Sequence, residues 1–297
     1  MTTGSGPTAH GIWKARRLPC NPIIHPGLDA SIGENINGPS LIRVPEWVEK
    51  PLGRYYLYFA HHTGRHIRLA YADRLCGPWT IYRPGVLSVD EAFCEHHVAS
   101  PDVHVDDERR QIRMYYHGPS PEEQRTHVAI SHDGLTFRAR PENLGPSYFR
   151  VWQWDGWHYA IAMPGILLRS RDGLTGFETG PRVFTHHLMR HSAVLLEGST
   201  LWIFFSNIGD CPEHIVVSRL ELSGDWTDWT PTPWESVLLP EEDYEGAGLP
   251  LEPSVMGRAP GPVCQLRDPA VFQEDGRTWL LYSVSGESGI AIAELIR

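Results

Sequence analysis

Short apolar strands separated by turns recur along this chain as a repeating unit. Five units open with a small or polar residue and a nearby proline or serine, starting near Gly38, Ser100, Gly145, His191 and Asp268. A second, strongly apolar or aromatic strand follows in each unit, at residues 55–60, 113–118, 158–163, 201–206 and 279–284. A third follows at residues 67–72, 127–132, 166–170, 215–222 and 290–295. No stretch sustains helical periodicity over a dozen residues, so the pattern predicts an all-β protein.

Turn residues and short fourth strands complete the repeat. Asp133-Gly134 and Asp172-Gly173 end two of the third strands, and Asp-Gly supplies the positive φ of a tight turn. Fourth strands are expected at residues 79–82, 137–140 and 177–180. Five units of about four antiparallel strands predict one five-bladed β-propeller over residues 1–297. A tandem of two immunoglobulin-like sandwiches is the alternative, but no linker divides the chain.

The fifth unit has room for only three strands before the chain ends at Arg297. We therefore expect residues 12–17, within an N-terminal closing strand and tail of residues 1–20, to supply its fourth strand and close the ring. Residues 84–98 and 231–264 lengthen the first and fourth repeats. Both insertions lead into the inner strand of the next blade, so both could roof the central depression.

Charge and composition exclude several classes of protein. With 26 Lys and Arg against 36 Asp and Glu, the net charge is −10, which argues against nucleic-acid binding. No apolar stretch approaches the roughly 20 residues that span a bilayer, and residues 1–17 contain no secretory h-region. The five cysteines form no C-x-x-C motif, so we expect reduced, structural thiols in a cytoplasmic protein.

The starts of the inner strands would converge on the propeller axis and line a single funnel. Carboxylates, imidazoles, guanidinium groups and amides gather there in the sequence. Such a mixture suits a polyhydroxylated ligand, because each sugar hydroxyl both donates and accepts hydrogen bonds. We therefore expect a small carbohydrate as partner. The candidate binding residues are Asn37, His97, Arg190, Arg267, Tyr244 and Glu287.

A family resemblance rests on the fifth unit. Leu266-Arg267-Asp268-Pro269-Ala270-Val271-Phe272 precedes a Gly turn and the strand Trp279-Leu280-Leu281-Tyr282. This motif, and the tail 286–293, resemble the closing blade of the five-bladed propellers in glycoside hydrolase families 43, 32 and 117. The repeat pattern is similar over residues 21–295. The resemblance implies a propeller fold and a glycosidase that cleaves furanosides or related sugars.

The catalytic triad of family 43 does not carry over to this chain. The family has a general-base Asp opening blade one, a second Asp opening blade two and an acidic Glu in blade three. The positions equivalent to Asp268 are Gly38, Ser100 and Gly145, and Asp102 lies two residues beyond the second of these.

Other acids could do the work of an inverting glycosidase, which needs two carboxyl groups about 6.5–9.5 Å apart. Asp102 and Asp268 could face each other across the axis, with Glu245 as the acid if its insertion buries it. His191 is a substitute acid, since relatives in family 117 use a histidine. The structural alternatives are strand-entrance caps for both Asp residues and a solvated loop position for Glu245.

Histidine is abundant, with 16 residues in the chain. His97, His191 and Asp102 could bind a cation near the axis, although ordinary hydrogen-bonded histidines are the alternative. No other cofactor or metal is expected.

Three functions remain open from the sequence. The first is a glycosidase acting on a small glycoside or oligosaccharide by an inverting two-carboxylate mechanism. The second is a catalytically silent carbohydrate-binding propeller, and the third is a propeller hydrolase or lyase with a different substrate. A closed funnel with two carboxylates favours catalysis, whereas an open aromatic shelf favours binding.

Overall fold

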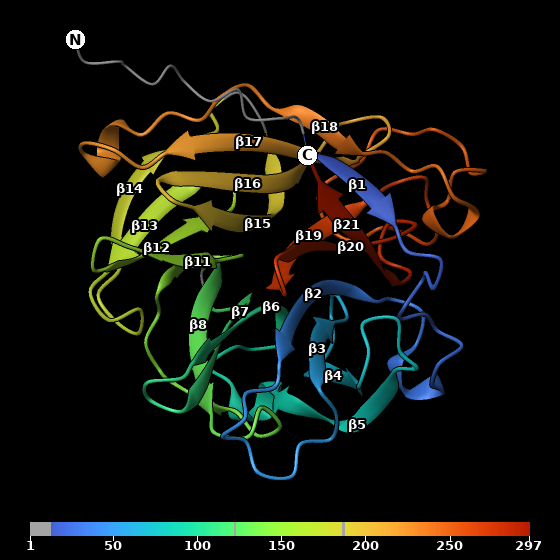
Figure 1. The fold of residues 1–297 in the computed structure, drawn as a ribbon, viewed down its shortest axis with the longest axis horizontal. Coiled ribbons are helices and arrows are strands. Elements are labelled where there is room, and N and C mark those ends of the chain that lie inside the picture. The colour runs from blue at the N-terminus through green and yellow to red at the C-terminus, as the bar shows by residue number, and fades with distance from the viewer. Residues whose placement is uncertain (1–12, 122, 186–187) are drawn as a thin grey trace.

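The computed structural model describes residues 13–297 except 122, 186 and 187, and it is a five-bladed β-propeller (Figure 1). Five antiparallel sheets surround one axis. The innermost strands are β2 (Asn37–Arg43), β6 (Ala99–Asp106), β11 (Arg150–Trp154), β15 (Met189–Glu197) and β19 (Arg267–Glu274). The second strands are β3 (Tyr55–Ala60), β7 (Gln111–Pro119), β12 (Trp157–Ala162), β16 (Thr200–Asn207) and β20 (Arg277–Ser283). All-β architecture and blade number are confirmed.

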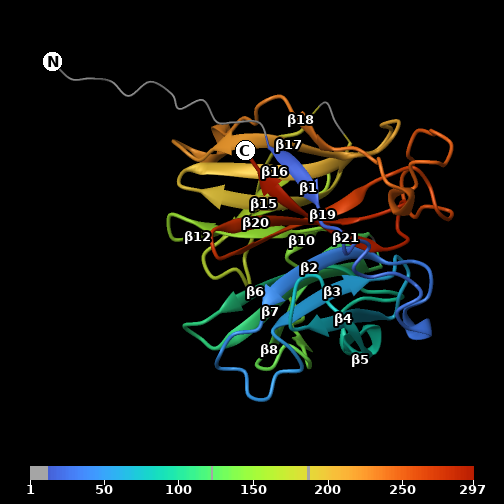
Figure 2. The ribbon, with the colours of Figure 1, turned by 45° about the vertical axis from the view of Figure 1, so that its right-hand side comes forward.

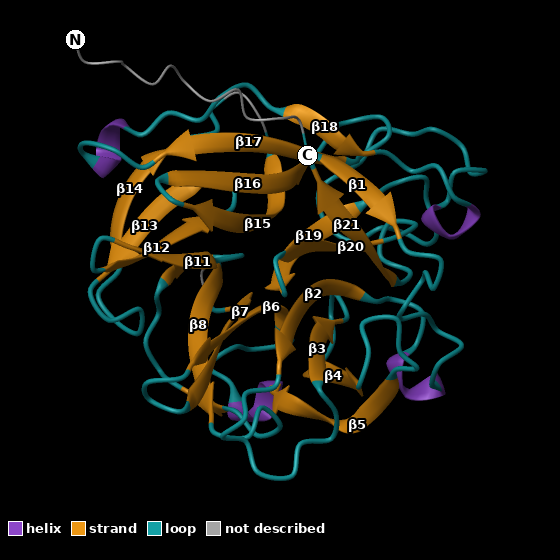
Figure 3. Cartoon of the chain, in the orientation of Figure 1, coloured by secondary structure: helices purple, strands orange, loops and turns teal. Residues whose placement is uncertain are grey.

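The outer strands complete each sheet. The third strands are β4 (His66–Ala72), β8 (Gln124–Ser131), β13 (Ile166–Ser170), β17 (Ile215–Glu221) and β21 (Ile290–Ile296). The outermost are β5 (Thr80–Ser88), β9 (Arg138–Ala139), β10 (Gly145–Pro146), β14 (Glu178–Arg182) and β18 (Glu235–Leu238). Short 3₁₀ helices lie in the connections (Figure 3): η1 (Ala30–Ile32), η2 (Val89–Glu91), η3 (Trp226–Asp228) and η4 (Asp243–Glu245).

The two ends of the chain close the ring together. Strand β1 (Lys14–Arg17) pairs antiparallel with β21, with Lys14 opposite Ile296, and supplies the fourth strand of blade five (Figure 2). This confirms the predicted closing strand, although residue 12 lies outside the described part of the chain.

The hydrophobic core is divided among the interfaces between blades. Strand β3 is buried along its whole length, since its side chains face both neighbouring blades. Tyr56 and Tyr58 pack toward Met114 of blade two, whereas Leu57 packs toward Leu281 of blade five. Similar clusters lie between blades two and three, three and four, and four and five. Each blade therefore depends on both neighbours, as expected for a propeller.

The third blade begins later than the sequence suggested. Its inner strand starts at Arg150, whereas Gly145 and Pro146 pair with β8 and extend blade two. The reason is conformational. The residue at the entrance of an inner strand adopts a positive φ at Ser100 (50°) and Asp268 (49°), and in blade three Tyr148 (66°) does so. The equivalent of Asp268 in blade three is therefore Tyr148.

The cysteines correct another expectation. Cys20 and Cys76 form a disulfide with a Cα–Cα distance of 5.6 Å, which joins the segment after β1 to the segment after β4. The expectation of reduced thiols is therefore wrong for this pair, because 56 residues separate two cysteines that the fold brings together. The cytoplasmic location stays a prediction. Within the described residues, no helix is long and apolar enough to cross a bilayer.

Candidate functional site

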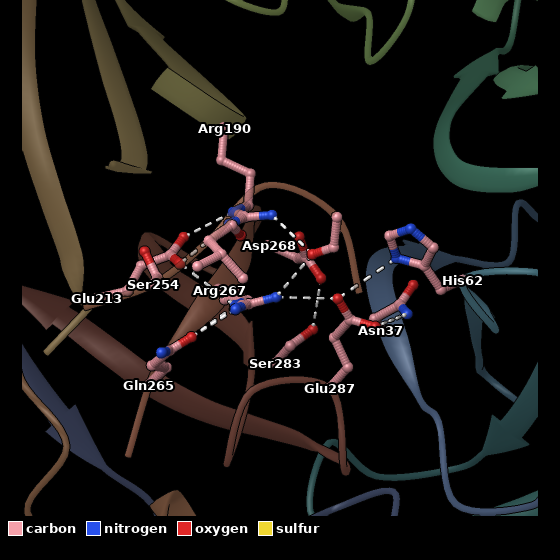
Figure 4. A network of polar contacts seen from close by, with 12 residues as sticks. Asn37, His62, Arg190, Glu213, Ser254, Gln265, Arg267, Asp268, Ser283 and Glu287 are labelled. Carbon is pink, nitrogen blue, oxygen red and sulfur yellow. Dashed lines mark hydrogen bonds and ion pairs between the residues drawn. The ribbon is translucent and has the colours of Figure 1, made fainter. Parts of the chain in front are cut away.

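Charged and amide side chains meet where the inner strands begin (Figure 4). Four inner strands shift register just after their first residue, between Asn37 and Ser40 in β2 and at the matching positions of β6, β15 and β19. Such bulges redirect side chains, here toward the axis. We call the resulting group the axial cluster, and it comprises Asn35, Asn37, His62, Arg190, His191, Glu213, Arg267, Asp268 and Glu287.

Two predicted arginines share one buried carboxylate. Glu213 is fully buried and lies 2.9 Å from Nε of Arg190 and 3.3 Å from Nε of Arg267. Both guanidinium groups also donate to the carbonyl oxygen of Gly257, at 3.2 and 3.3 Å. The arginines therefore hold the insertion before blade five over the axis. The sequence analysis missed Glu213, because nothing local marks an acid that sits between strands β16 and β17.

Glu287 is held ionised by its neighbours. Its Oε1 lies 3.1 Å from Nη1 of Arg267 and 3.4 Å from Nδ1 of His62. Its Oε2 accepts hydrogen bonds from the side-chain amides of Asn35 (2.7 Å) and Asn37 (3.3 Å). Burial alone would raise the pKa of Glu287, but the hydrogen bonds from His62 and Asn35 and the charge of Arg267 lower it to about 2. Glu287 therefore carries a negative charge at neutral pH.

Asp268 and His191 form a pair on the axis. Asp268 is 1% exposed, and its Oδ2 accepts hydrogen bonds from Ser283 Oγ (3.0 Å) and Gly38 N (3.3 Å). Its Oδ1 contacts Nδ1 of His191. Burial, with the charge of Arg190, lowers the pKa of His191 well below its usual value. A neutral imidazole whose Nδ1 faces a carboxylate leaves Nε2 free to accept a proton.

Two further rings, those of Tyr148 and His117, lie in a tilted row with the ring of His191. The ring of Tyr148 lies between His117 and His191, with centroid distances of 4.0 and 3.9 Å. Burial raises the pKa of Tyr148 to about 12, so the phenol stays protonated at neutral pH. The sequence analysis missed Tyr148 because it placed the blade entrance at Gly145.

A cavity of about 590 Å³ opens next to the axial cluster, between blades one and five. Glu287, Asn35, His61 and Arg258 are among its lining residues. His97 is half-buried, and burial together with the charge of His62 lowers its pKa.

Asp102 lies away from the axial cluster, deeper along the axis. Its Oδ2 accepts a hydrogen bond from Val151 N at 2.9 Å and lies 2.8 Å from Nε2 of His104. Burial would raise the pKa of Asp102, but the charges of His104 and Arg150 lower it. The carboxylate thus links blade two to blade three. The structure gives Asp102 a role in this link, and its pairing with Asp268 as acid and base stays a prediction.

Glu245 and Tyr244 lie against the closing strand. Glu245 is fully buried and accepts hydrogen bonds from Nε and Nη2 of Arg17 and from Tyr282 Oη, at 2.8–2.9 Å. Tyr244 Oη accepts a hydrogen bond from Asn21 Nδ2 at 3.3 Å. The carboxylate of Glu245 is therefore paired with Arg17, which is distant in sequence. The roles of Glu245 as acid and of Tyr244 in binding stay predictions.

The predicted cation site is not assembled. Among the described residues, no group of three or more His, Cys, Asp or Glu side chains is placed to hold a metal ion. Asp102 faces His104, whereas His191 faces Asp268.

Solved structures that resemble this fold include glycoside hydrolases and a putative glycosidase. A family 43 β-xylosidase/α-arabinofuranosidase from a compost microbial metagenome, in complex with xylotriose, is 13% identical, with a TM-score of 0.64 and coverage of 95% of this chain and 96% of that chain. A putative glycosidase from Bacteroides thetaiotaomicron is 13% identical, with a TM-score of 0.69 and coverage of 94% and 96%. A family 130 enzyme, from a study of hydrolases that target β-1,2 mannosidic linkages in Candida mannan, is 12% identical, with a TM-score of 0.69 and coverage of 98% and 95%. The chain therefore has the five-bladed propeller fold of these hydrolases.

Comparison of sequences identifies a relative that shows the family of this chain. No family model matches the chain. It is 36% identical, over an alignment of 318 residues, to an uncharacterised protein of Acanthamoeba polyphaga mimivirus, with 94% of this chain and 89% of the viral protein covered. The chain belongs to the same family as this mimivirus protein.

Proposed function

We propose that this protein is a glycosidase that cleaves a small glycoside or oligosaccharide at the axial cluster. The observation that carries the proposal is the Asp268–His191 pair, buried at the entrances of the inner strands beside the ionised Glu287. The fold supports it, since the xylosidase and the mannoside-active enzyme named above share this architecture. Function is nevertheless argued from the site, because one fold hosts many activities.

The cavity beside the cluster, which Asp268 and His191 do not line, would hold the part of the sugar that extends away from this pair. Its volume of about 590 Å³ lies within the roughly 300–1,000 Å³ that is usual for small-molecule sites. Glu287 and Asn35 present acceptor oxygens and an amide at its wall, and sugar hydroxyl groups could hydrogen-bond to both. The arginines would act indirectly, by holding Glu287 and the insertion in place.

The proposed chemistry uses His191 as the base. Its low pKa keeps the imidazole neutral, and Asp268 orients it so that Nε2 takes a proton from the attacking water. In this proposal His191 acts as the base instead of the acid, because burial and the charge of Arg190 lower the pKa of its imidazole. The protonated phenol of Tyr148, whose ring lies against His191, would give its proton to the departing oxygen. The protonated imidazole of His191 would then return a proton to the phenolate, which restores both groups. Glu287, with its pKa near 2, would stay ionised and bind hydroxyl groups.

Hydrolysis of chromogenic glycosides tests the proposal. The full chain would be screened with 4-nitrophenyl arabinofuranosides, xylosides and mannosides, and kcat/KM compared with that of Asp268→Asn and His191→Gln. We expect each variant to lose at least about 100-fold, which is typical of a general acid or base. Matched controls are Glu252→Gln and His96→Ala, both exposed, which should retain activity.

Two results would decide against it. Full turnover by both axial variants would refute the assigned roles of Asp268 and His191. Sugar binding by calorimetry, without turnover of any glycoside, would identify a carbohydrate-binding propeller instead of an enzyme.

A further inference from the structure

One buried arginine near the axis lacks a full set of partners. Arg150, the first residue of β11, is 3% exposed. Its Nη1 donates to the carbonyl oxygen of Phe149 at 3.0 Å, but its buried Nη2 has no hydrogen-bond partner among the described residues. Arg190 and Arg267 differ, because both are paired with Glu213. Buried polar groups are nearly always satisfied, so a free guanidinium nitrogen indicates a missing partner.

Other unpartnered groups lie around it. His117 Nδ1 and Ser192 Oγ are also buried without a partner among the described residues. Tyr148, two residues before Arg150 in the chain, places its ring between His117 and His191, at centroid distances of 4.0 and 3.9 Å. Each of these unpartnered groups can donate a hydrogen bond. Together they call for an acceptor.

The space beside Arg150 is small. An axial channel of about 130 Å³ is lined by Pro39, Asp102, Arg150, Ala193 and Ala270, among others. This is far below the roughly 300–1,000 Å³ of ordinary ligand pockets, so it suits a single acidic group and no sugar ring.

The carboxylate in this channel does not satisfy the arginine. Asp102 directs its Oδ2 to Val151 N and His104, and no carboxylate among the described residues forms an ion pair with Arg150. A guanidinium group with a free edge matches the two oxygens of a carboxylate or a phosphate.

We propose that Arg150 forms an anion-recognition subsite in this axial channel, and that the sugar bound at the axial cluster carries a carboxylate or a phosphate group. The inference rests on the proposed function, which supplies the sugar. The substrate class then becomes an acidic glycoside, such as a uronic acid, or a sugar whose cleavage involves phosphate.

Calorimetry with three probes tests the subsite: glucuronate, glucose and inorganic phosphate. We expect wild-type protein to bind glucuronate at least about tenfold more tightly than glucose, as a charge-assisted contact provides. Arg150→Gln should abolish this preference and leave glucose binding unchanged. The control Arg138→Gln, at an exposed position of β9, should keep it.

The titration with inorganic phosphate distinguishes an anion carried by the sugar from free phosphate. Phosphate that binds to wild type and not to Arg150→Gln, without any preference for glucuronate, would assign the subsite to free phosphate. If glucuronate is preferred over glucose and phosphate competes with glucuronate for binding, the subsite is assigned to an acidic sugar. If Arg150→Gln does not fold, Arg150→Lys takes its place, because it keeps the charge, loses the planar fork and should weaken the preference.

Equal binding of glucuronate and glucose, with no phosphate bound, would overturn the inference, as would a preference that survives in both Arg150 variants. Neither result bears on the hydrolysis of neutral glycosides, which tests the proposed function separately.

Discussion

The charged side chains at the axis differ in whether an oppositely charged group pairs with them. Arg190 and Arg267 are bound to Glu213, whereas Asp268 contacts only a neutral imidazole through its Oδ1. Burial makes an unpaired charge costly, so the two paired arginines are structural, whereas an incompletely paired group is available to a ligand. The same comparison singles out Arg150.

Glu287 should make stability depend on acid pH. Its pKa in the folded protein is about 2, below the ordinary value of 4.5, so its contribution is fully present above pH 4.5 and is lost as the pH falls toward 2. This shift corresponds to about 3 kcal/mol of the free energy of unfolding. Urea denaturation of wild type and Glu287→Gln between pH 2 and 7 would measure it. The variant should be less stable at pH 7 and lack this part of the acid dependence; parallel curves would contradict the prediction.

The sequence could predict only part of the site. Asp268 and Arg267 follow from a local motif, and Asn37 and Glu287 from positions relative to the strands. Glu213 and the partners of Glu245 could not be predicted, because each pairing joins segments that only the closed ring brings together.

At the scale of strands, polar side chains fasten neighbouring blades. The hydroxyl of Tyr58 donates to Gly134 O at 2.9 Å, and that of Tyr115 donates to Gly173 O at 2.8 Å. Both acceptors lie in the Asp-Gly turns of the next blade. Gly173 has a φ of 69°, and a Cβ there would meet His158 at 2.6 Å, so the turn requires glycine. The turns predicted from sequence therefore also serve as contacts between blades.

Removal of one such hydroxyl should weaken the molecule modestly. Tyr115→Phe leaves the carbonyl of Gly173 without its donor, and we expect the free energy of unfolding to fall by about 1–2 kcal/mol. Tyr82→Phe is the matched control, since its hydroxyl forms no hydrogen bond with a described residue. Chemical denaturation measures both variants. An equal loss in the control would show that the hydrogen bond contributes nothing.

We expect Asp102 to stabilise the contact between blades two and three and not to act in catalysis. It accepts from Val151 N just as Ser40 Oγ accepts from Val103 N at 2.9 Å, each joining one inner strand to the next. We expect Asp102→Ala to lower the free energy of unfolding by about 1–3 kcal/mol, because a buried amide loses its acceptor. Asp102→Asn should keep the link and most of the activity. Loss of turnover in a stably folded Asp102→Asn protein would restore the catalytic interpretation.

At the scale of the whole molecule, the five blades form a ring that is closed by the pairing of β1 with β21. Strand order and blade number could be predicted because the repeat is visible five times in the sequence. The Cys20–Cys76 disulfide could not, since the pairing depends on how the chain returns after β1 to lie beside blade one.

The disulfide should stabilise the closed ring. It joins residues 56 apart, which corresponds to about 4 kcal/mol in the chain-entropy model. Reduction of wild type should therefore lower the melting temperature to that of Cys20→Ser/Cys76→Ser, and reduction should leave the double variant unchanged. Cys211→Ser, at an exposed thiol, is the control. Identical melting curves with and without reductant would contradict this.

The pairing of β1 with β21 also bears on how the protein folds. Strand β1 can pair only after β21 has formed, because Lys14 lies opposite Ile296. We therefore expect the contacts of greatest sequence separation to form last. Long-range strand pairing is slow, and four finished blades would meanwhile expose the faces that blade five covers. Lys14 and Ile296 lie side by side. A circularly permuted chain that is opened at a turn such as Asp275-Gly276 would therefore join β21 to β1 directly, and their pairing would become a local contact.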